Sequence, residues 1–281
     1  MASKSIKRRV FNVTWWSIWT SFLYPVCKLK NSFILIFYLI LICRADTDDT
    51  AINLSIGTSL YNLQNDFPSS FSSWKNMNTG NQSMEWFTNA LKEYSYKPFS
   101  KDSNVNTIDP RCYYWIQEYL QTLDSTATNT SFITTWLLDI NTDKTSYYHN
   151  YAMPFNVNNV DASVAANTIQ GLSRSLIYNP NTDVWFDDEL QNVYRDTVDL
   201  ISWVINRRLL DDRPDLVLLY YMGNYNFYWF VSRTVYLLNS NSDNLPYPVM
   251  SYALDTLKDS MRTSGTQAIM DNSMLYYNVP F

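Results

Sequence analysis

Apolar residues recur at intervals of three and four positions over much of the chain, which is the spacing of one face of an α-helix. Clusters of Asn, Asp, Ser and Pro separate these segments and are typical of loops. Strand patterns are scarce, and the best candidate, residues 216–221, is predicted to be a buried loop or a short helix. The pattern predicts helices at 83–94, 110–123, 162–178, 187–207, 225–238 and 248–261, and loops at 64–82, 97–110, 141–160 and 239–248.

A phrase of three parts recurs along the second half of the chain, about sixty residues apart. A tyrosine pair and an aromatic or Pro-Phe segment come first, a helix with a Ser-Arg-Ser or Ser-Arg-Thr core follows, and an Asn-rich turn ends the phrase. The tyrosine pairs begin at Tyr147, Tyr220 and Tyr276, and the two arginines are Arg174 and Arg233. Repetition at a fixed spacing indicates stacked structural units.

The helices at 161–178 and 187–207 are expected to form one antiparallel hairpin, and those at 225–238 and 248–261 the next. The first helix of each pair lacks a strong polar face, so it is predicted to lie inside with its partner facing solvent. The predicted fold class is all-α, with hairpins stacked as an open solenoid or an α/α toroid. The long repeat favours the toroid. A complete ring needs more chain, so the toroid is expected to be incomplete or truncated.

Residues 1–45 have a different character. Basic residues from Lys4 to Arg9 precede an uncharged, aromatic-rich run, and the segment 33–43 is the most hydrophobic of the chain. Such a segment rises only about 16 Å as a helix, short of the ~30 Å hydrocarbon core, which favours a signal peptide. Residues 43–45 resemble a cleavage site, whereas an uncleaved segment would be a signal anchor in the membrane. Either outcome places a domain at 46–281 outside the cytosol, and the alternative is a buried core helix.

Three Asn-x-Ser/Thr sequons lie downstream of this segment, at Asn53, Asn81 and Asn129, and predict N-glycosylation in the secretory pathway. Of the three cysteines, only Cys112 would remain after cleavage. The domain is therefore expected to be stabilised by packing and not by disulfide bonds. A single cysteine also excludes a Cys-rich zinc site, and no metal or cofactor is predicted.

Composition narrows the classes of partner. The formal net charge is −5, and charged residues make up 17% of the chain. Nucleic-acid binding depends on clustered Lys and Arg, so no nucleic-acid partner is expected. The chain is rich in aromatic residues, with 22 Tyr and 10 Trp, which form the rim of a core or, alternatively, a cleft that stacks on a ligand. A glycan or protein partner fits that second interpretation.

Candidate catalytic residues are few. His149 is the only histidine, and it lies in a Tyr-rich loop with Tyr147 and Tyr148 that would rim the mouth of a toroid. A structural histidine, hydrogen-bonded within the loop, is the simpler interpretation. Asp161 is a good N-cap for the helix at 162–178, and it is also the carboxylate that an enzyme would place at the same mouth.

Arg174 and Arg233 are candidate ligand-binding residues, together with Trp229 and the two tyrosines beside His149. An arginine on an inner helix must find a buried partner or point into a central cavity. In a cavity it could bind a carboxylate of a ligand, and otherwise it ties adjacent units together. Both interpretations are open.

Helical hairpins preceded by aromatic segments resemble the α/α-toroid superfamily, which includes terpene cyclases and several glycan-processing enzymes. Residues Asp46 to Ala51 are also similar to the D-x-D-D-T-A phrase of class II terpene cyclases. The resemblance implies that Asp48, the middle aspartate, would protonate an isoprenoid substrate. The alternative is an acidic helix start, in which Asp and Thr residues cap a helix through Ile52 and Leu54.

The sequence therefore predicts a non-enzymatic, extracytoplasmic helical-repeat protein that acts in binding or assembly. The second hypothesis is a toroid enzyme or enzyme remnant that acts on a glycan or an isoprenoid. An enzyme would need at least two acidic side chains that converge in one cavity with perturbed pKa values. A binding module needs only an aromatic or apolar concavity.

Overall fold

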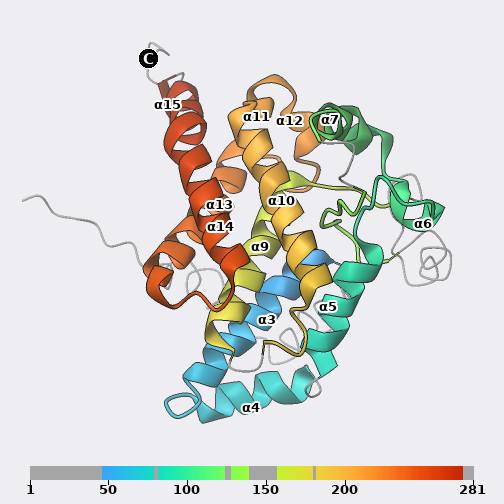
Figure 1. Cartoon of the computed structure of the whole chain (residues 1–281). Coiled ribbons are helices and arrows are strands. Elements are labelled where there is room, and N and C mark those ends of the chain that lie inside the picture. The colour runs from blue at the N-terminus through green and yellow to red at the C-terminus, as the bar shows by residue number, and fades with distance from the viewer. Residues whose placement is uncertain (1–45, 79–81, 124–127, 139–156, 180–181, 275–281) are drawn as a thin grey trace, which may run out of the picture. The chain divides into compact units, whose positions relative to one another are not determined.

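The computed structural model describes residues 46–78, 82–123, 128–138, 157–179 and 182–274, and these residues are mostly helical (Figure 1). Within these ranges no strand forms, and extended backbone pairs only as isolated bridges between Asp46 and Trp136 and between Tyr96 and Phe132. The all-α prediction is confirmed for this part of the chain. The helices are α3 (Thr47–Asn62), α4 (Pro68–Met77), α5 (Gln82–Tyr94), α6 (Ser103–Asn106), α7 (Pro110–Leu120), α9 (Ala162–Tyr178), α10 (Asp188–Asn206), α11 (Leu209–Asp212), α12 (Pro214–Val217), α13 (Asn224–Ser240), η4 (Ser242–Asn244), α14 (Pro248–Ser260), η5 (Met261–Gly265) and α15 (Thr266–Met274).

The six helices predicted from periodicity are all present. Helix α9 has the predicted bounds, and the Asp161 side chain caps it by accepting hydrogen bonds from the backbone N–H groups of Ser163 and Val164. Asp187 caps α10 in the same way through Leu190 N–H. An N-cap carboxylate satisfies N–H groups that lack an intrahelical partner, which is why these two starts could be recognised from sequence.

Three predictions about local structure are wrong in part. Residues 64–82 are not all loop, because α4 occupies part of this range, and the predicted loop at 97–110 contains the short helix α6. The Trp74 ring of α4 lies directly on α3, where a Cβ atom added to Gly57 would fall 2.0 Å from it. The serine-rich sequence of α4 hid the apolar spacing of Phe67, Phe71 and Trp74. The predicted acidic cap is also only half right, since α3 begins at Thr47 but the Asp46 side chain makes no capping hydrogen bond.

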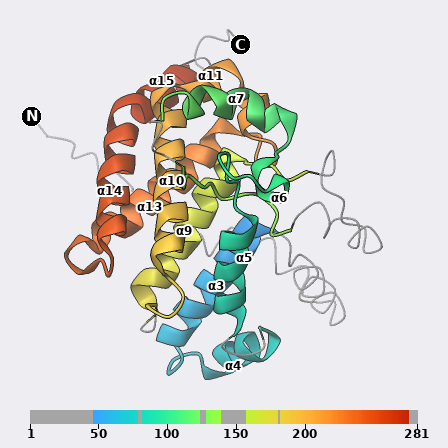
Figure 2. The ribbon, with the colours of Figure 1, turned by 45° about the vertical axis from the view of Figure 1, so that its right-hand side comes forward.

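The longer helices pack in two layers. Helices α3, α9 and α13 form one layer, which we name the inner layer, and α9 contacts both of the others. Helices α5, α10 and α14 form the second layer, named the outer layer, in which α10 occupies the middle. Each inner helix also contacts its outer partner, which makes three hairpins (Figures 1 and 2). The α9/α10 and α13/α14 hairpins are as predicted. The hairpin of α3 with α5 was not predicted.

Helices α3 and α9 run parallel and very close together. Near their amino ends Asn167 bonds Asp48, and near their carboxyl ends Arg174 bonds Ser59. Between these contacts, a Cβ atom on Gly171 would lie 2.8 Å from the backbone of Ala51. Only glycine permits this approach, because any side chain would overlap the facing helix.

Helix α9 is the centre of the core. Fourteen of its seventeen residues are buried, against ten of nineteen in its partner α10. The prediction that the first helix of this hairpin lies inside is confirmed. For the second hairpin the same prediction is wrong: seven of the seventeen residues of α13 are buried, against six of thirteen in α14. Phe227 and Phe230 of α13 are buried as expected, but Trp229 is 37% exposed.

The described residues lie within one compact unit, residues 45–281. The predicted targeting segment, residues 1–45, lies outside the described residues. Among the helices that the structure describes, none is both long and apolar enough to cross a bilayer.

Candidate functional site

Asp161 is buried, 1% exposed, and its carboxylate joins the start of α9 to the loop before α13. It accepts hydrogen bonds from the N–H groups of Ser163, Val164, Leu219 and Tyr220 and from the Ser163 hydroxyl. Burial raises the pKa of Asp161, while these donors favour the charged form. With both oxygens engaged in this way, Asp161 is a structural junction and offers no free oxygen to a substrate.

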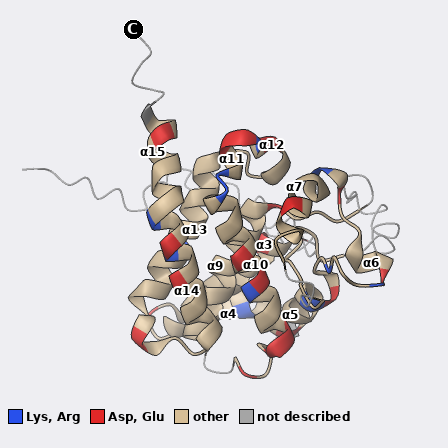
Figure 3. Cartoon of the chain, turned by 45° about the horizontal axis from the view of Figure 1, so that its top comes forward, with Lys and Arg blue, Asp and Glu red and all other residues tan. Residues whose placement is uncertain are grey.

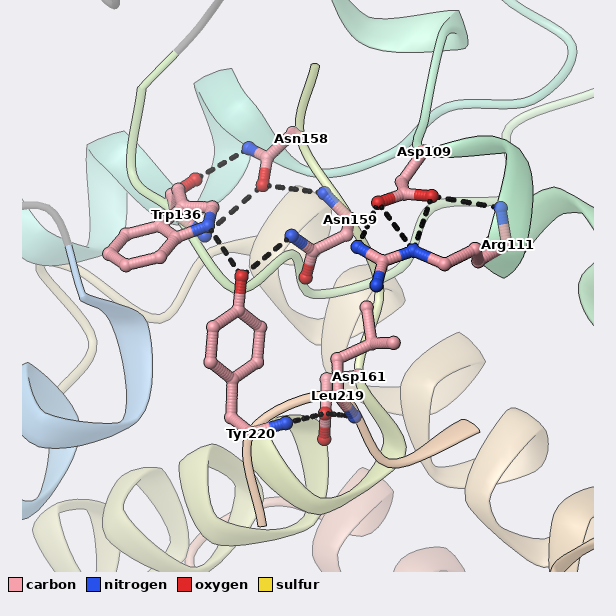
Figure 4. A network of polar contacts seen from close by, with 8 residues as sticks. All are labelled: Asp109, Arg111, Trp136, Asn158, Asn159, Asp161, Leu219 and Tyr220. Atoms are coloured by element: carbon pink, nitrogen blue, oxygen red, sulfur yellow. Dashed lines mark hydrogen bonds and ion pairs between the residues drawn. The ribbon is translucent and has the colours of Figure 1, made fainter. Parts of the chain in front are cut away.

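The Tyr220 side chain extends this junction into a polar network (Figure 4). Its hydroxyl oxygen accepts hydrogen bonds from Trp136 Nε1 at 3.1 Å and from Asn159 Nδ2 at 3.0 Å. Asn158 holds the backbone of Trp136, accepting from its N–H and donating to its carbonyl oxygen. The tyrosine of the repeated phrase therefore connects the loop before α13 to two segments far away in sequence.

Tyr221, the second tyrosine of the pair, binds the acidic start of α3. Its hydroxyl donates to Asp48 Oδ2 at 2.8 Å, and Asn167 Nδ2 donates to the same oxygen at 2.7 Å. Asp48 is 1% exposed. The two carboxylates that the sequence singled out, Asp48 and Asp161, are thus both held by the Tyr220–Tyr221 pair, through different donors.

The neighbours of Asp48 carry displaced pKa values. Burial, a hydrogen bond with Asp48 and the charges of Asp48 and Asp49 raise the pKa of Asp46 to about 8. Burial and the charge of Asp48 also raise the pKa of Asp49. Asp46 Oδ1 and Asn167 Oδ1 are buried without a hydrogen-bond partner among the described residues. This acidic start (Asp46, Asp48 and Asp49) therefore holds a proton near neutral pH.

The described residues contain no group of His, Cys, Asp and Glu side chains arranged to hold a metal ion. Cys112 is fully buried, and burial raises the pKa of its thiol, so the reactive thiolate is disfavoured. Neither a metal centre nor a cysteine nucleophile is built from this part of the chain.

The two repeated arginines lie on neighbouring inner helices. Arg174 Nε donates to Ser59 Oγ of α3 at 3.0 Å, and its guanidinium lies 5.6 Å from the centre of the Tyr178 ring. The Arg233 guanidinium lies over Trp229, 4.4 Å from the ring centre. Desolvation and the positive charge of Arg174 lower the pKa of Arg233. Three inner helices thus contribute to one arginine site, made of Ser59, Arg174, Tyr178, Trp229 and Arg233.

Other arginines of the chain differ in their partners. Arg213 also stacks on an aromatic ring, that of Tyr114, but it forms an ion pair with Asp215 at 2.9 Å. Arg195 lies over the Tyr252 ring, and its charge opposes the burial that raises the pKa of the nearby Asp199. Arg174 and Arg233 form no ion pair with any described carboxylate. The charge of the arginine site is therefore uncompensated within the described residues.

Several predicted site residues lie outside the described residues, namely His149, Tyr147, Tyr148 and Asn81. Of the other sequons, Asn53 lies within α3, where its side chain donates to Asn78 Oδ1 and accepts from Trp74 Nε1. Asn129 is exposed, at the edge of a polar pocket of about 510 Å³. The side chain of Asn129 is accessible for the attachment of an oligosaccharide. An oligosaccharide on Asn53 would disrupt the contact between α3 and α4.

Sequence reasoning missed four partners: Ser59, Asn167, Tyr178 and Tyr221 in its contact with Asp48. The only signal was the conspicuous Tyr220–Tyr221 pair, because a serine, an asparagine or a tyrosine on a helix does not indicate its distant neighbour. Figure 3 shows Asp and Glu residues on α5, α10, α14 and α15, interspersed with Lys and Arg.

Comparison with protein-family models, with curated proteins and with solved structures found no match to this chain.

Proposed function

We propose that this protein is an extracytoplasmic helical-repeat protein that binds a ligand through an anionic group and does not act as an enzyme. One observation carries this proposal: two guanidinium groups, Arg174 and Arg233, lie on adjacent inner helices without a carboxylate partner among the described residues. Partly buried charge is normally kept only when it is paired. An anionic group of a glycan or a protein would supply the missing partner.

The acidic residues favour binding over catalysis. Asp161 has all its acceptor capacity directed at structural donors, and Asp48 is held by Asn167 and Tyr221. A catalytic carboxylate needs an oxygen within reach of the reacting atom. The arginine site, by contrast, includes the exposed rings of Trp229 and Tyr178, so solvent reaches its rim.

The proposal also includes the toroid architecture and the delivery of the protein out of the cytosol. Three hairpins with parallel inner helices support an α/α toroid or incomplete toroid, in which the arginine site lies on the inner layer. The hydrophobic segment 33–43 supports delivery out of the cytosol, either by a cleaved signal peptide or by an anchor. N-terminal sequencing of the protein recovered from medium and from membranes tests this delivery, and recovery of an intact chain from the cytosol contradicts it.

The binding function is tested by thermal unfolding of the full chain in the presence of chloride, acetate, phosphate and sulfate at constant ionic strength. A ligand that binds only the folded state raises the melting temperature as its concentration rises. We expect at least one oxyanion to do so in the wild type and not in an Arg174→Gln/Arg233→Gln double variant. Equal melting curves for the two proteins in every anion contradict the proposal.

A second function, a toroid enzyme or enzyme remnant acting on an isoprenoid or a glycan, is favoured by one observation. The pKa of Asp46, about 8, keeps a carboxylic acid protonated near neutral pH beside Asp48. The test is incubation of the protein with linear isoprenoids and analysis of the products by mass spectrometry. A cyclised product that is lost in both Asp46→Asn and Asp48→Asn would establish this function.

A further inference from the structure

The arginine site has two positive charges on neighbouring helices, close enough for the charge of Arg174 to lower the pKa of Arg233. Arg174 belongs to α9 and Arg233 to α13, and these helices pack against each other in the inner layer. Among the described residues, none accepts a hydrogen bond from Arg233, and Ser59 alone accepts one from Arg174. A ligand that neutralises the site fully must therefore carry two negative charges, or two singly charged groups.

Each guanidinium has an aromatic neighbour. Arg233 lies over the Trp229 ring, 4.4 Å from its centre, and Arg174 over the Tyr178 ring, 5.6 Å from its centre. The N–H groups of a guanidinium point outward in its plane, as a fork that matches two oxygens of one oxyanion. Cation–π attraction holds each guanidinium near its ring without an oxygen acceptor, so these contacts leave the N–H groups available to a ligand.

Ser59 restrains Arg174 further. Its hydroxyl accepts from Arg174 Nε at 3.0 Å and donates to the Ser55 carbonyl oxygen at 2.9 Å. The chain of two hydrogen bonds connects the guanidinium to the backbone of α3. Because Nε is engaged, the terminal Nη groups are the part of Arg174 that remains for a ligand.

We infer that the arginine site binds a phosphate dianion, either free phosphate or the terminal group of a phosphomonoester. A tetrahedral dianion has enough oxygens for both forks and a charge equal to that of the two arginines. A carboxylate or a sulfate ester has a single charge and leaves the site half neutralised. This inference rests on the proposed anion-binding function and specifies its ligand class.

Isothermal titration calorimetry of the full chain at pH 8, at constant ionic strength, tests the inference. The titrants are phosphate, methyl phosphate, dimethyl phosphate, methyl sulfate and acetate. We expect phosphate or methyl phosphate to bind at least about tenfold more tightly than the three monoanions, since each additional bidentate pair contributes on the order of 1.4 kcal/mol or more. Comparison of the two dianions distinguishes free phosphate from a phosphomonoester as the source.

Variants locate the binding. Arg174→Gln and Arg233→Gln should each weaken methyl phosphate binding at least about tenfold, and Arg174→Lys should weaken it less, because the charge stays while the fork is lost. Arg195→Gln is the matched control, since Arg195 also stacks on a ring, that of Tyr252, but lies in the outer layer. It should leave the affinity unchanged. Circular dichroism and the melting temperature verify that each variant is folded.

The titration results distinguish the inferred preference for a phosphate dianion from the proposed anion-binding function on which it rests. If acetate or methyl sulfate binds as tightly as methyl phosphate and still depends on both arginines, the dianion inference is wrong and the anion-binding function stands. If no titrant binds, or if methyl phosphate binds equally well to both glutamine variants, the inference and the proposed function fail together.

Discussion

The acidic residues and the arginines of the inner layer differ in whether the described residues supply them with partners. Asp161 and Asp48 are almost fully buried, and backbone and side-chain donors from several elements surround them. Arg174 and Arg233 lie further along the same layer, half-buried on aromatic rings, and no described carboxylate faces them. Within the described part of the chain, Asp161 and Asp48 thus have internal donors, whereas Arg174 and Arg233 have no carboxylate partner.

This difference suggests which residues stabilise the fold and which serve the proposed binding function. A buried carboxylate that accepts five hydrogen bonds stabilises one arrangement of α9 and the Tyr220 loop, and its removal leaves several donors without a partner. Arg174, whose contacts among the described residues are one serine and an aromatic ring, contributes less to that arrangement, which is consistent with the proposed role in binding. Variants of the first kind should affect folding, and variants of the second kind should affect binding.

The largest effect is expected for Asp161→Asn. The amide would point an N–H group at the N–H donors of Leu219 and Tyr220 and would lose the charge that they stabilise. We expect the free energy of unfolding in urea to fall by about 3 kcal/mol. Asp187→Asn is the control, because asparagine also caps helices well and this position is exposed, so a loss below about 1 kcal/mol is expected. Equal losses in the two variants would contradict the structural role of Asp161.

Gly171→Ala tests the contact that places Ser59 beside Arg174. The added Cβ would meet the Ala51 backbone at 2.8 Å, so α3 and α9 must move apart. We expect a loss of about 2 kcal/mol in the free energy of unfolding. Gly223→Ala is the control, because its Cβ would meet only the Asn226 side chain, at 3.4 Å. A melting temperature unchanged in Gly171→Ala would show that the helices are not in close contact.

Tyr220→Phe should destabilise the protein by about 1 kcal/mol, because Trp136 Nε1 and Asn159 Nδ2 lose their common acceptor. Trp136 should also change its environment, which tryptophan fluorescence detects. Tyr236→Phe alters an exposed ring and is expected to have no effect on either measurement. If both variants unfold at the wild-type temperature, the network around Tyr220 contributes nothing to stability.

The acidic start of α3 predicts a dependence of stability on pH. The folded-state pKa of Asp46, about 8, is higher than the ordinary 3.8, so the folded protein keeps a proton that the unfolded chain releases. This contribution is fully present below pH 4 and is lost as the pH rises to about 8. Asp46→Asn should therefore leave stability at pH 4 unchanged and raise it at pH 8, because the neutral amide has no proton to lose.

Urea unfolding at several pH values measures this effect. The exposed Asp243→Asn is the control and should shift stability equally, if at all, at each pH. A difference between Asp46→Asn and the wild type that does not depend on pH would show that Asp46 is ionised in the folded protein.

Part of this architecture could be predicted because its signals are local. The start of α9 follows from Asp161 and the apolar spacing after it, and its inner position follows from the small residues Ala165 and Gly171. The α3/α5 hairpin could not be predicted in the same way. Helix α3 has polar and apolar residues on all sides and becomes recognisable as an inner helix only by its packing on α9.

In the candidate site, too, some residues could be recognised from the sequence, whereas their partners could not. Arg174 and Arg233 attract attention as repeated residues, and Asp48 by its phrase, but their partners lie far away along the chain. Asp48 is 119 residues from Asn167 and 173 from Tyr221, and Arg174 is 115 residues from Ser59. No periodicity relates positions at such separations.

The sequence by itself therefore determined the helical class, most helix positions and the inner place of α9, because a helix and its cap depend on residues three and four positions apart. Only the tertiary structure decided which carboxylates have hydrogen-bond donors and which arginines have no carboxylate partner among the described residues. Those properties depend on burial and on hydrogen-bond partners that approach from other helices, and packing α3, α9 and α13 side by side brings them together.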